Sequence, residues 1–244
     1  MVLIGSFDLL VLGSTAFLAS LLGSVAGSGG TALLLPVLVL YFGVREAIPI
    51  LTIANLSSNF GRAWFNRRDI STPVVGWFSL GSIPLALTGA MLFVLTPPMV
   101  LARILGIFLL LTVAWRRLRL RPPKFNSARW FVPIGAVFGL LNGLLEGVGS
   151  LMAPFFLAYG LVRGAYIGTD ALATTLMQIS KLGVFGGAHL IEINVLTAGL
   201  TLVPFMIGGA FAGKKIVDRI SESVFVLIID LTLLVAGLNF LFVK

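Results

Sequence analysis

Two glycine-rich stretches interrupt apolar segments that are otherwise long enough to lie in a membrane, and they constrain the fold more than any other feature. The first spans Gly23–Thr31 and is followed by Pro36; the second spans Gly143–Ser150 and is followed by Pro154. Lipid cannot hydrogen-bond to free backbone groups, so irregular backbone survives at membrane depth only where it is packed in protein or lines a cavity. Such breaks in both halves of a chain indicate a ligand site between the halves.

The composition places the chain in a lipid bilayer. Of its 244 residues, 58% are apolar and 11% are charged, whereas about 25% of the residues of a soluble globular protein are charged. Apolar runs such as Leu9–Ala26 and Val224–Val243 reach the length of a spanning helix. The gaps between these runs are too short for a folded domain outside the membrane. We therefore predict an all-α, polytopic membrane protein.

The sequence carries no signature of an enzyme. It has no cysteine, which excludes disulfides and cysteine-based metal or redox sites. It contains no nucleophile elbow, no P-loop, no zinc-protease helix and no cofactor fingerprint. The single histidine, His189, has only Glu192 nearby in sequence and does not form a metal-ligand set. We expect no catalytic residue, no metal, no cofactor and no ATP-driven step within this chain.

The net charge of +8 comes mainly from three short loops, which contain 12 of the 17 basic residues. These residues are Arg62, Arg67, Arg68, Arg116, Arg117, Arg119, Arg121, Lys124, Arg129, Lys214, Lys215 and Arg219. Basic residues concentrate in the cytoplasmic loops of membrane proteins. The loops lack the interleaved aromatic residues and the fold of a nucleic-acid site. We predict cytoplasmic basic loops, no nucleic-acid partner, and the plasma membrane of a bacterial or archaeal cell.

Ten helical segments follow from the apolar runs, and they fall into two sets of five. We predict them at 8–26, 31–43, 47–65, 74–95, 100–116, 130–146, 150–160, 165–187, 195–212 and 223–243. At 1.5 Å per residue, the segments 31–43 and 150–160 are too short to cross about 30 Å of hydrocarbon. They are half-helices, re-entrant segments, or continuations of their neighbours.

The two sets of segments predict an inverted-topology repeat. Pro36 precedes Pro154 by 118 residues, and the Pro84…Gly89 pair precedes the Pro204…Gly209 pair by 120. Counting crossings from cytoplasmic basic loops makes the two halves enter the membrane from opposite sides if 31–43 crosses; a re-entrant segment would change this parity. We assign residues 1–121 to the first repeat, 122–129 to a basic cytoplasmic connector and 130–244 to the second repeat.

The glycine-rich breaks are candidate anion sites. A helix that begins at a break presents unpaired N–H groups and a partial positive charge. We predict that the breaks bind substrate through Ser28, Gly29, Gly30, Thr31, Gly147, Gly149 and Ser150. The alternative is helix packing alone, because Gly135, Gly139, Gly143 and Gly147 form a stripe of small residues on one helix face.

Polar residues form stripes within two corresponding apolar segments. In 47–65 the stripe contains Thr52, Asn55 and Asn59; in 165–187 it contains Thr169, Asp170, Thr174, Gln178 and Lys181. Spacings of three and four residues place side chains on one helix face. The matched stripes predict a shared interior cavity, with hydrogen bonds that merely join helices as the alternative. We include Thr52, Asn55, Asn59, Thr169, Thr174, Gln178 and Lys181 among the candidate substrate-binding residues.

Ionisable residues inside apolar segments are candidates for function, because an intramembrane charge is costly. Asp170 and Lys181 lie 11 residues apart, too far along one helix to pair directly. We propose Lys181 as the counter-charge of an anion, and Asp170 and Glu146 as candidate carriers of a coupling proton. Arg62 is expected to anchor the chain at the interface or in the cytoplasm, although its position on the stripe leaves substrate contact open.

The order of glycines and prolines along nearly the whole chain resembles that of the sulfite exporter TauE/SafE family. The similarity rests on Gly27-Ser-Gly-Gly with Pro36, on Gly147-Val-Gly149 with Pro154, and on the two Pro-x4-Gly segments. The resemblance implies a secondary transporter that exports sulfite, sulfoacetate or a related small anion.

The chain departs from the common pattern of that family at Glu146 and Ser150, where a purer glycine run is usual. A carboxylate beside an anion site is unfavourable unless it is compensated. Either Glu146 is protonated, or it pairs with a base such as Lys181, or the substrate differs.

We therefore expect a secondary transporter that moves a small anion such as sulfite or an organosulfonate by alternating access, driven by a proton or sodium gradient. One alternative is a transporter of a cation or neutral metabolite, in which Asp170 and Glu146 bind the ligand. Another is a membrane assembly factor that transports nothing. The sequence leaves the oligomeric state open.

Overall fold

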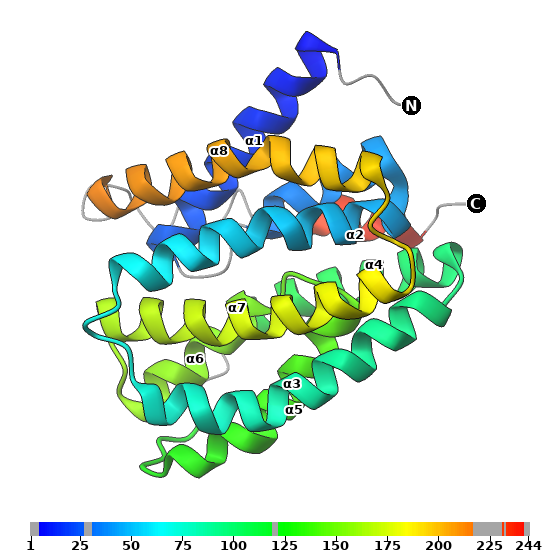
Figure 1. Ribbon diagram of the computed structural model, residues 1–244. Coiled ribbons are helices and arrows are strands. Elements are labelled where there is room, and N and C mark those ends of the chain that lie inside the picture. Colours follow the sequence, from blue (N-terminus) through cyan, green and yellow to red (C-terminus); the bar gives the residue numbers. More distant parts are fainter. Residues whose placement is uncertain (1–4, 27–30, 119–121, 217–230, 232, 242–244) are drawn as a thin grey trace.

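The computed structural model describes residues 5–26, 31–118, 122–216, 231 and 233–241, and every regular element within them is helical (Figure 1). The α-helices are α1 (Ser6–Ala26), α2 (Thr31–Phe65), α3 (Thr72–Leu95), α4 (Pro98–Arg117), α5 (Phe131–Leu144), α6 (Gly149–Tyr159), α7 (Arg163–Gly187) and α8 (Ile193–Ile216). A 3₁₀ turn at Ala128–Trp130 leads into α5, and residues 233–241 are helical. The all-α prediction is confirmed.

Five of the described helices are long and apolar enough to cross a membrane: α1, α2, α3, α4 and α8. Helix α7 has 25 residues, a length of about 37 Å, and carries the buried Asp170 and Lys181. Large apolar side chains cover the outer surface; Phe7, Leu95 and Val235 are 76%, 78% and 69% exposed. Apolar residues outside and charged residues inside are the arrangement of a polytopic membrane protein.

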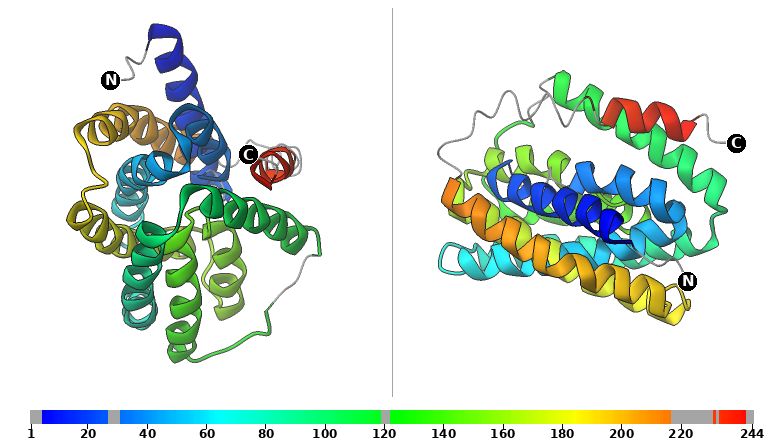
Figure 2. Two further views of the ribbon diagram at one scale, coloured as in Figure 1. Left: turned by 90° about the vertical axis from the view of Figure 1, so that its right-hand side faces the viewer. Right: turned by 90° about the horizontal axis from the view of Figure 1, so that it is seen from above.

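The long helices lie side by side, and α2 and α7 occupy the middle (Figures 1 and 2). Helix α2 packs on α8 on one side and on α7 on the other, and α7 packs in turn on α3. Helix α1 joins α8 at one edge, and α5 joins α3 at the opposite edge. The polar stripes of α2 and α7 therefore meet at the centre of the helix array.

Glycine lets two helix pairs approach almost to backbone contact. A Cβ on Gly139 of α5 would lie 2.3 Å from the carbonyl oxygen of Ser82 in α3, and Gly135 and Gly143 are equally close to α3 backbone. A Cβ on Gly209 of α8 would lie 2.2 Å from the carbonyl oxygen of Phe17 in α1. The predicted packing role of Gly135, Gly139 and Gly143 is thus confirmed, whereas Gly147 has open space around it.

The contacts between helices agree with a repeat of the two halves. If α1 corresponds to α5 and α3 corresponds to α8, the pair α1–α8 exchanges with the pair α3–α5. The contact of α2 with α8 exchanges likewise with the contact of α7 with α3. The inverted orientation of the two five-segment halves stays a prediction.

Helix breaks occur at the predicted places. Gly43 interrupts α2 with φ 72° and ψ 167°, so that 31–42 is a separate short helix. Helix α5 ends at Leu144 and α6 begins at Gly149, which confirms the interruption within Gly143–Ser150. Helix α6 spans 11 residues and ends at Gly160 with φ 102°. At the first break α1 ends at Ala26 and α2 begins at Thr31; Gly27–Gly30 lie outside the described residues.

The remaining predicted segment, 223–243, lies mostly outside the described residues. Its helical part at 233–241 runs beside α4 (Figure 2), where Gly106 of α4 faces the backbone of Gly237.

Candidate functional site

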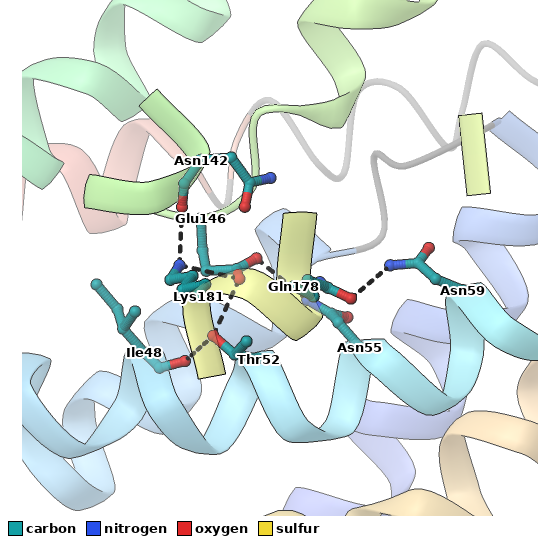
Figure 3. Close-up of polar contacts among 8 residues, drawn as sticks. All are labelled: Ile48, Thr52, Asn55, Asn59, Asn142, Glu146, Gln178 and Lys181. Atoms are coloured by element: carbon teal, nitrogen blue, oxygen red, sulfur yellow. Dashed lines mark hydrogen bonds and ion pairs between the residues drawn. The ribbon is translucent and has the colours of Figure 1, made fainter. Parts of the chain in front are cut away.

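The candidate site lies where the polar stripes of α2 and α7 face each other. The stripe residues of α2 (Thr52, Asn55, Asn59) and those of α7 (Asp170, Thr174, Gln178, Lys181) are all buried, none more than 5% exposed. The Asn59 Nδ2 donates to Gln178 Oε1 at 3.0 Å and joins the two helices (Figure 3). The two stripes meet, and the contact between them is a hydrogen bond that joins the helices; the shared cavity stays a prediction.

Helices α2 and α7 run antiparallel. Asn59 meets Gln178, whereas Asn66, seven residues further along α2, meets Gly168 near the start of α7. The buried carboxyl of Asp170 therefore lies on the stretch of α7 that faces the end of α2.

A buried ion pair connects the second break to α7. The Lys181 Nζ lies 3.1 Å from Glu146 Oε1, and the two side chains are 1% and 2% exposed. The same Nζ donates to the backbone carbonyl of Asn142 at 2.7 Å, at the end of α5. It also lies 5.4 Å from the ring centre of Phe185, within the range of a cation–π contact. Of the three alternatives for Glu146, pairing with Lys181 is the one that the structure contains.

Side chains of α2 complete the environment of the Glu146 carboxylate. The Thr52 hydroxyl lies 3.1 Å from Glu146 Oε1 and also reaches the carbonyl of Ile48 at 2.7 Å. The Asn55 Nδ2 lies 3.4 Å from Glu146 Oε2, a long contact. Lys181 Nζ, Thr52 Oγ1 and Asn55 Nδ2, from two helices, thus lie around one carboxylate (Figure 3). The Thr52 hydroxyl has a single proton, which the Ile48 carbonyl and the Glu146 carboxylate share.

The backbone at Glu146 is left-handed, which places its side chain at the break and not on either helix. Glu146 has φ 76° and Gly147 has φ 81°. A positive φ is uncommon for a residue with a Cβ. The bonds that the carboxylate makes to α2 and α7 offset the cost of this conformation.

Arg62 is part of the buried polar layer, so its predicted role as an interface anchor is wrong. Its side chain is 6% exposed. The guanidinium donates to the carbonyl of Gly23 in α1 at 3.1 Å and to Asn59 Oδ1. In the sequence, Arg62 lies close to the basic loop at Arg67 and Arg68, which favours a position at the interface. The sequence signal for the buried role is its place on the stripe, three residues after Asn59.

A constant offset of 119 residues relates the contacts of Arg62 to those of Lys181. Arg62 donates to the carbonyl of Gly23, and Lys181 donates to the carbonyl of Asn142. Both carbonyls lie near the end of the helix that precedes a break. Asn59 and Gln178, which bond to each other, are related by the same offset. Two cations therefore flank the central Asn59–Gln178 bond, each three residues further along its own helix.

Some polar groups in this layer retain unused hydrogen-bonding capacity. Arg62 Nε, Asn142 Oδ1 and Thr174 Oγ1 are buried and make no hydrogen bond to any described residue. Buried polar atoms usually have partners, so the hydrogen-bonding capacity of these three atoms is unused within the described residues. Asn142 was not among the sequence candidates; as a single amide in a glycine-rich helix it gave no periodic signal.

The structure separates other candidates from this cluster. The Thr169 hydroxyl accepts a hydrogen bond from the backbone N–H of Ser71 at 3.0 Å, just before α3, and lies about 18 Å along α7 from Lys181. Asp170 is fully buried, about 16 Å along the same helix from Lys181. Gly147 belongs to the break and Gly149 begins α6.

Other candidates cannot be placed. Ser28, Gly29 and Gly30 lie outside the described residues. Thr31 begins α2 and Ser150 belongs to the first turn of α6, but their side chains are not described.

Comparison with known proteins identifies the family. The family described as "Sulfite exporter TauE/SafE" matches residues 12–240, which is nearly the whole chain. Comparisons with curated proteins and with solved structures gave no match. The family is one of membrane transporters of the anion-exporter type and not of enzymes, which agrees with an apolar helix array that encloses buried charged groups. The chain belongs to the sulfite exporter TauE/SafE family.

Proposed function

We propose that the chain is a secondary transporter that exports a small oxyanion, sulfite or an organosulfonate, by alternating access. The observation that carries this proposal is the set of buried donors around the Glu146 carboxylate. Lys181, Thr52 and Asn55 hold a carboxylate within the polar layer, and a sulfite or sulfonate presents oxygens of similar charge and spacing.

The position of the site supports alternating access. Glu146 lies on the break between α5 and α6, whereas its donors belong to α2 and α7. Breaks at Gly43, at Glu146–Gly147 and at Gly160 allow the short helices to change orientation relative to α2 and α7. A tilt of α6 would open the site toward one side of the membrane while the central Asn59–Gln178 bond closes the other.

We propose that the basic loops face the cytoplasm. The loop between α2 and α3, the segment leading into α5 and the end of α8 lie at the same end of the helix array (Figure 1). A common end for these loops supports the positive-inside assignment. Arg62 then lies on the cytoplasmic side of the Asn59–Gln178 bond, and Lys181 lies on the outer side. An exported anion would meet the two cations in that order.

A stability screen tests the substrate class. Purified full-length protein in detergent is heated with sulfite, sulfate, thiosulfate, sulfoacetate or a matched chloride control. A ligand at 100 times its Kd stabilises the native state by about 2.7 kcal/mol, which is a readily measured rise in melting temperature. Proteoliposomes loaded with the stabilising anion should release it when a proton or sodium gradient is imposed. If a cation stabilises the protein and none of the anions does, the proposal fails.

Burial of Asp170 favours one alternative, transport of a cation or a neutral metabolite. Asp170 is fully buried and is a candidate carrier of a coupling proton. The variant Asp170→Asn separates the two functions. A cation transporter loses ligand-dependent stabilisation when this carboxylate is removed, whereas an anion transporter keeps anion binding and loses only coupled flux.

A further inference from the structure

Among the described members of the polar layer, Glu146 is the residue with a Cβ that has a positive φ. It is 1% exposed and has φ 76° on the break between α5 and α6. Glycine takes this conformation without cost, whereas a residue with a Cβ does not. A glutamate at this position therefore carries a carboxylate into the layer at the cost of some backbone strain.

The donors around Glu146 match the needs of an exchangeable anion. Lys181 Nζ and Thr52 Oγ1 contact one carboxylate oxygen at 3.1 Å each, and Asn55 Nδ2 contacts the other at 3.4 Å. Each donor is buried, with exposures of 0%, 0% and 4%. Both donor helices are outside the break, so the carboxylate can leave without changing the fold of α2 or α7.

The relation between the two halves indicates that the carboxylate is an addition. The offset of 119 residues pairs Arg62 with Lys181, and Gly23 with Asn142, and their hydrogen bonds correspond. The same offset pairs Glu146 with Gly27 in the sequence. Arg62 bonds to two neutral oxygens, of Gly23 and Asn59. Among the described residues, the partners of Arg62 are therefore neutral oxygens, and the sequence has glycine where Glu146 stands in the other half.

We propose that Glu146 is a tethered internal anion that occupies the place of the transported oxyanion, which must displace it to bind to Lys181, Thr52 and Asn55. The inference rests on the proposed function and adds a regulatory step to the same site. The oxyanion and Glu146 exclude each other, because two negative charges would otherwise share one buried cation, Lys181. Displacement breaks one ion pair and forms another, and the displaced Glu146 carboxylate must leave the layer for water or take up a proton.

The consequence is that removing the Glu146 charge strengthens anion binding. An internal competitor reduces the apparent affinity by the fraction of molecules in which the site is open. Minor states of this kind hold about 0.1–10% of the population, so we expect the Kd for sulfite to fall about tenfold or more. Export against a gradient should fall in the same variant, because the site no longer releases its anion.

The experiment measures sulfite and sulfoacetate binding to full-length protein in nanodiscs by calorimetry. The variants are Glu146→Gln, which keeps the shape of the side chain, and Glu146→Gly, which suits φ 76° and gives a second folded variant. In the Glu146→Gly background, Thr52→Val should weaken sulfite binding by about tenfold, as expected for a hydrogen bond to a charged group. Thr112→Val is the matched control, since its buried hydroxyl donates to the carbonyl of Phe108 within α4, outside the polar layer.

The outcomes distinguish failure of the inference about Glu146 from failure of the proposed function. Tighter sulfite binding in both Glu146 variants, with a loss on adding Thr52→Val, supports the inference. If both Glu146 variants bind sulfite as tightly as the wild type does, or more weakly, the inference is overturned and the proposed function stands. Absence of anion binding and of anion flux in the wild type and in all variants overturns the proposed function, and the inference with it.

Discussion

Replacing Lys181 by methionine tests whether the buried ion pair holds Glu146 in place. Methionine keeps the unbranched apolar stem of lysine and removes its charge. Glu146 then retains the Thr52 hydroxyl at 3.1 Å and the long Asn55 contact, but loses its cation. Removing one partner of a buried ion pair costs about 3–5 kcal/mol. A hydrogen bond between membrane helices contributes about 0.6 kcal/mol on average, so the two kinds of contact can be told apart.

The cost falls on the folded state alone, because the Glu146 carboxylate is exposed to water when the chain unfolds. We expect the free energy of unfolding of Lys181→Met to be lower than that of the wild type by about 3–5 kcal/mol at pH 7.

The assay is unfolding of the full chain by SDS in mixed micelles at pH 7, followed by tryptophan fluorescence. Four proteins complete a double-mutant cycle: wild type, Lys181→Met, Glu146→Gln and the double variant. The double variant has no buried charge at this position and should lie within about 1 kcal/mol of the wild type. A loss below about 1 kcal/mol for Lys181→Met at pH 7, or a double variant as unstable as the sum of the single variants, would refute the reasoning.

Three further predictions use the same unfolding assay. Gly139→Ala should lower stability by about 1–3 kcal/mol, because its Cβ would lie 2.3 Å from a backbone oxygen of α3; Gly183→Ala, in a helix with open space, should be neutral or stabilising by up to about 1 kcal/mol. Gly43→Ala should lower the free energy of unfolding by about 1–3 kcal/mol, because alanine is strained at φ 72° and ψ 167°. Gly76→Ala is the control, since Gly76 is a helical glycine in open space. Equal effects of the two substitutions would contradict the explanation by backbone strain. Gln178→Leu should lower the free energy of unfolding by about 0.6 kcal/mol and by less than about 1.7 kcal/mol. The same substitution should abolish the stabilisation of the protein by sulfite. A variant that sulfite still stabilises would exclude Gln178 from the site.

The sequence predicted the helices well because lipid imposes length and polarity on each segment separately. The predicted ranges agree with the described helices to within a few residues. The breaks at Gly43 and after Gly143 were also predictable, since glycine and proline act on the local backbone. The polar stripe of α7 followed from spacings of three and four residues, and its buried position agrees with that pattern.

The partners of the buried groups were not predictable, because they depend on how segments far apart in the sequence pack. Glu146 had three possible states in the sequence, and only the approach of α7 to the break selects the pair with Lys181. Arg62 was assigned to the interface because a basic loop follows it, whereas α1 buries it against the carbonyl of Gly23. Thr169 shares its helix with Lys181 but bonds to the start of α3.

The glycine contacts at the two edges of the helix array limit how the protein can move. Helix α1 is held against α8, and α3 against α5, by backbone atoms that leave no room for even a methyl group. Each pair contains one helix from each half of the chain. A rigid-body rotation of one half relative to the other would therefore break these contacts. Under the proposed alternating access, we therefore expect the edge pairs α1–α8 and α3–α5 to move as units, while the short helices 31–42 and α6 change their orientation between them.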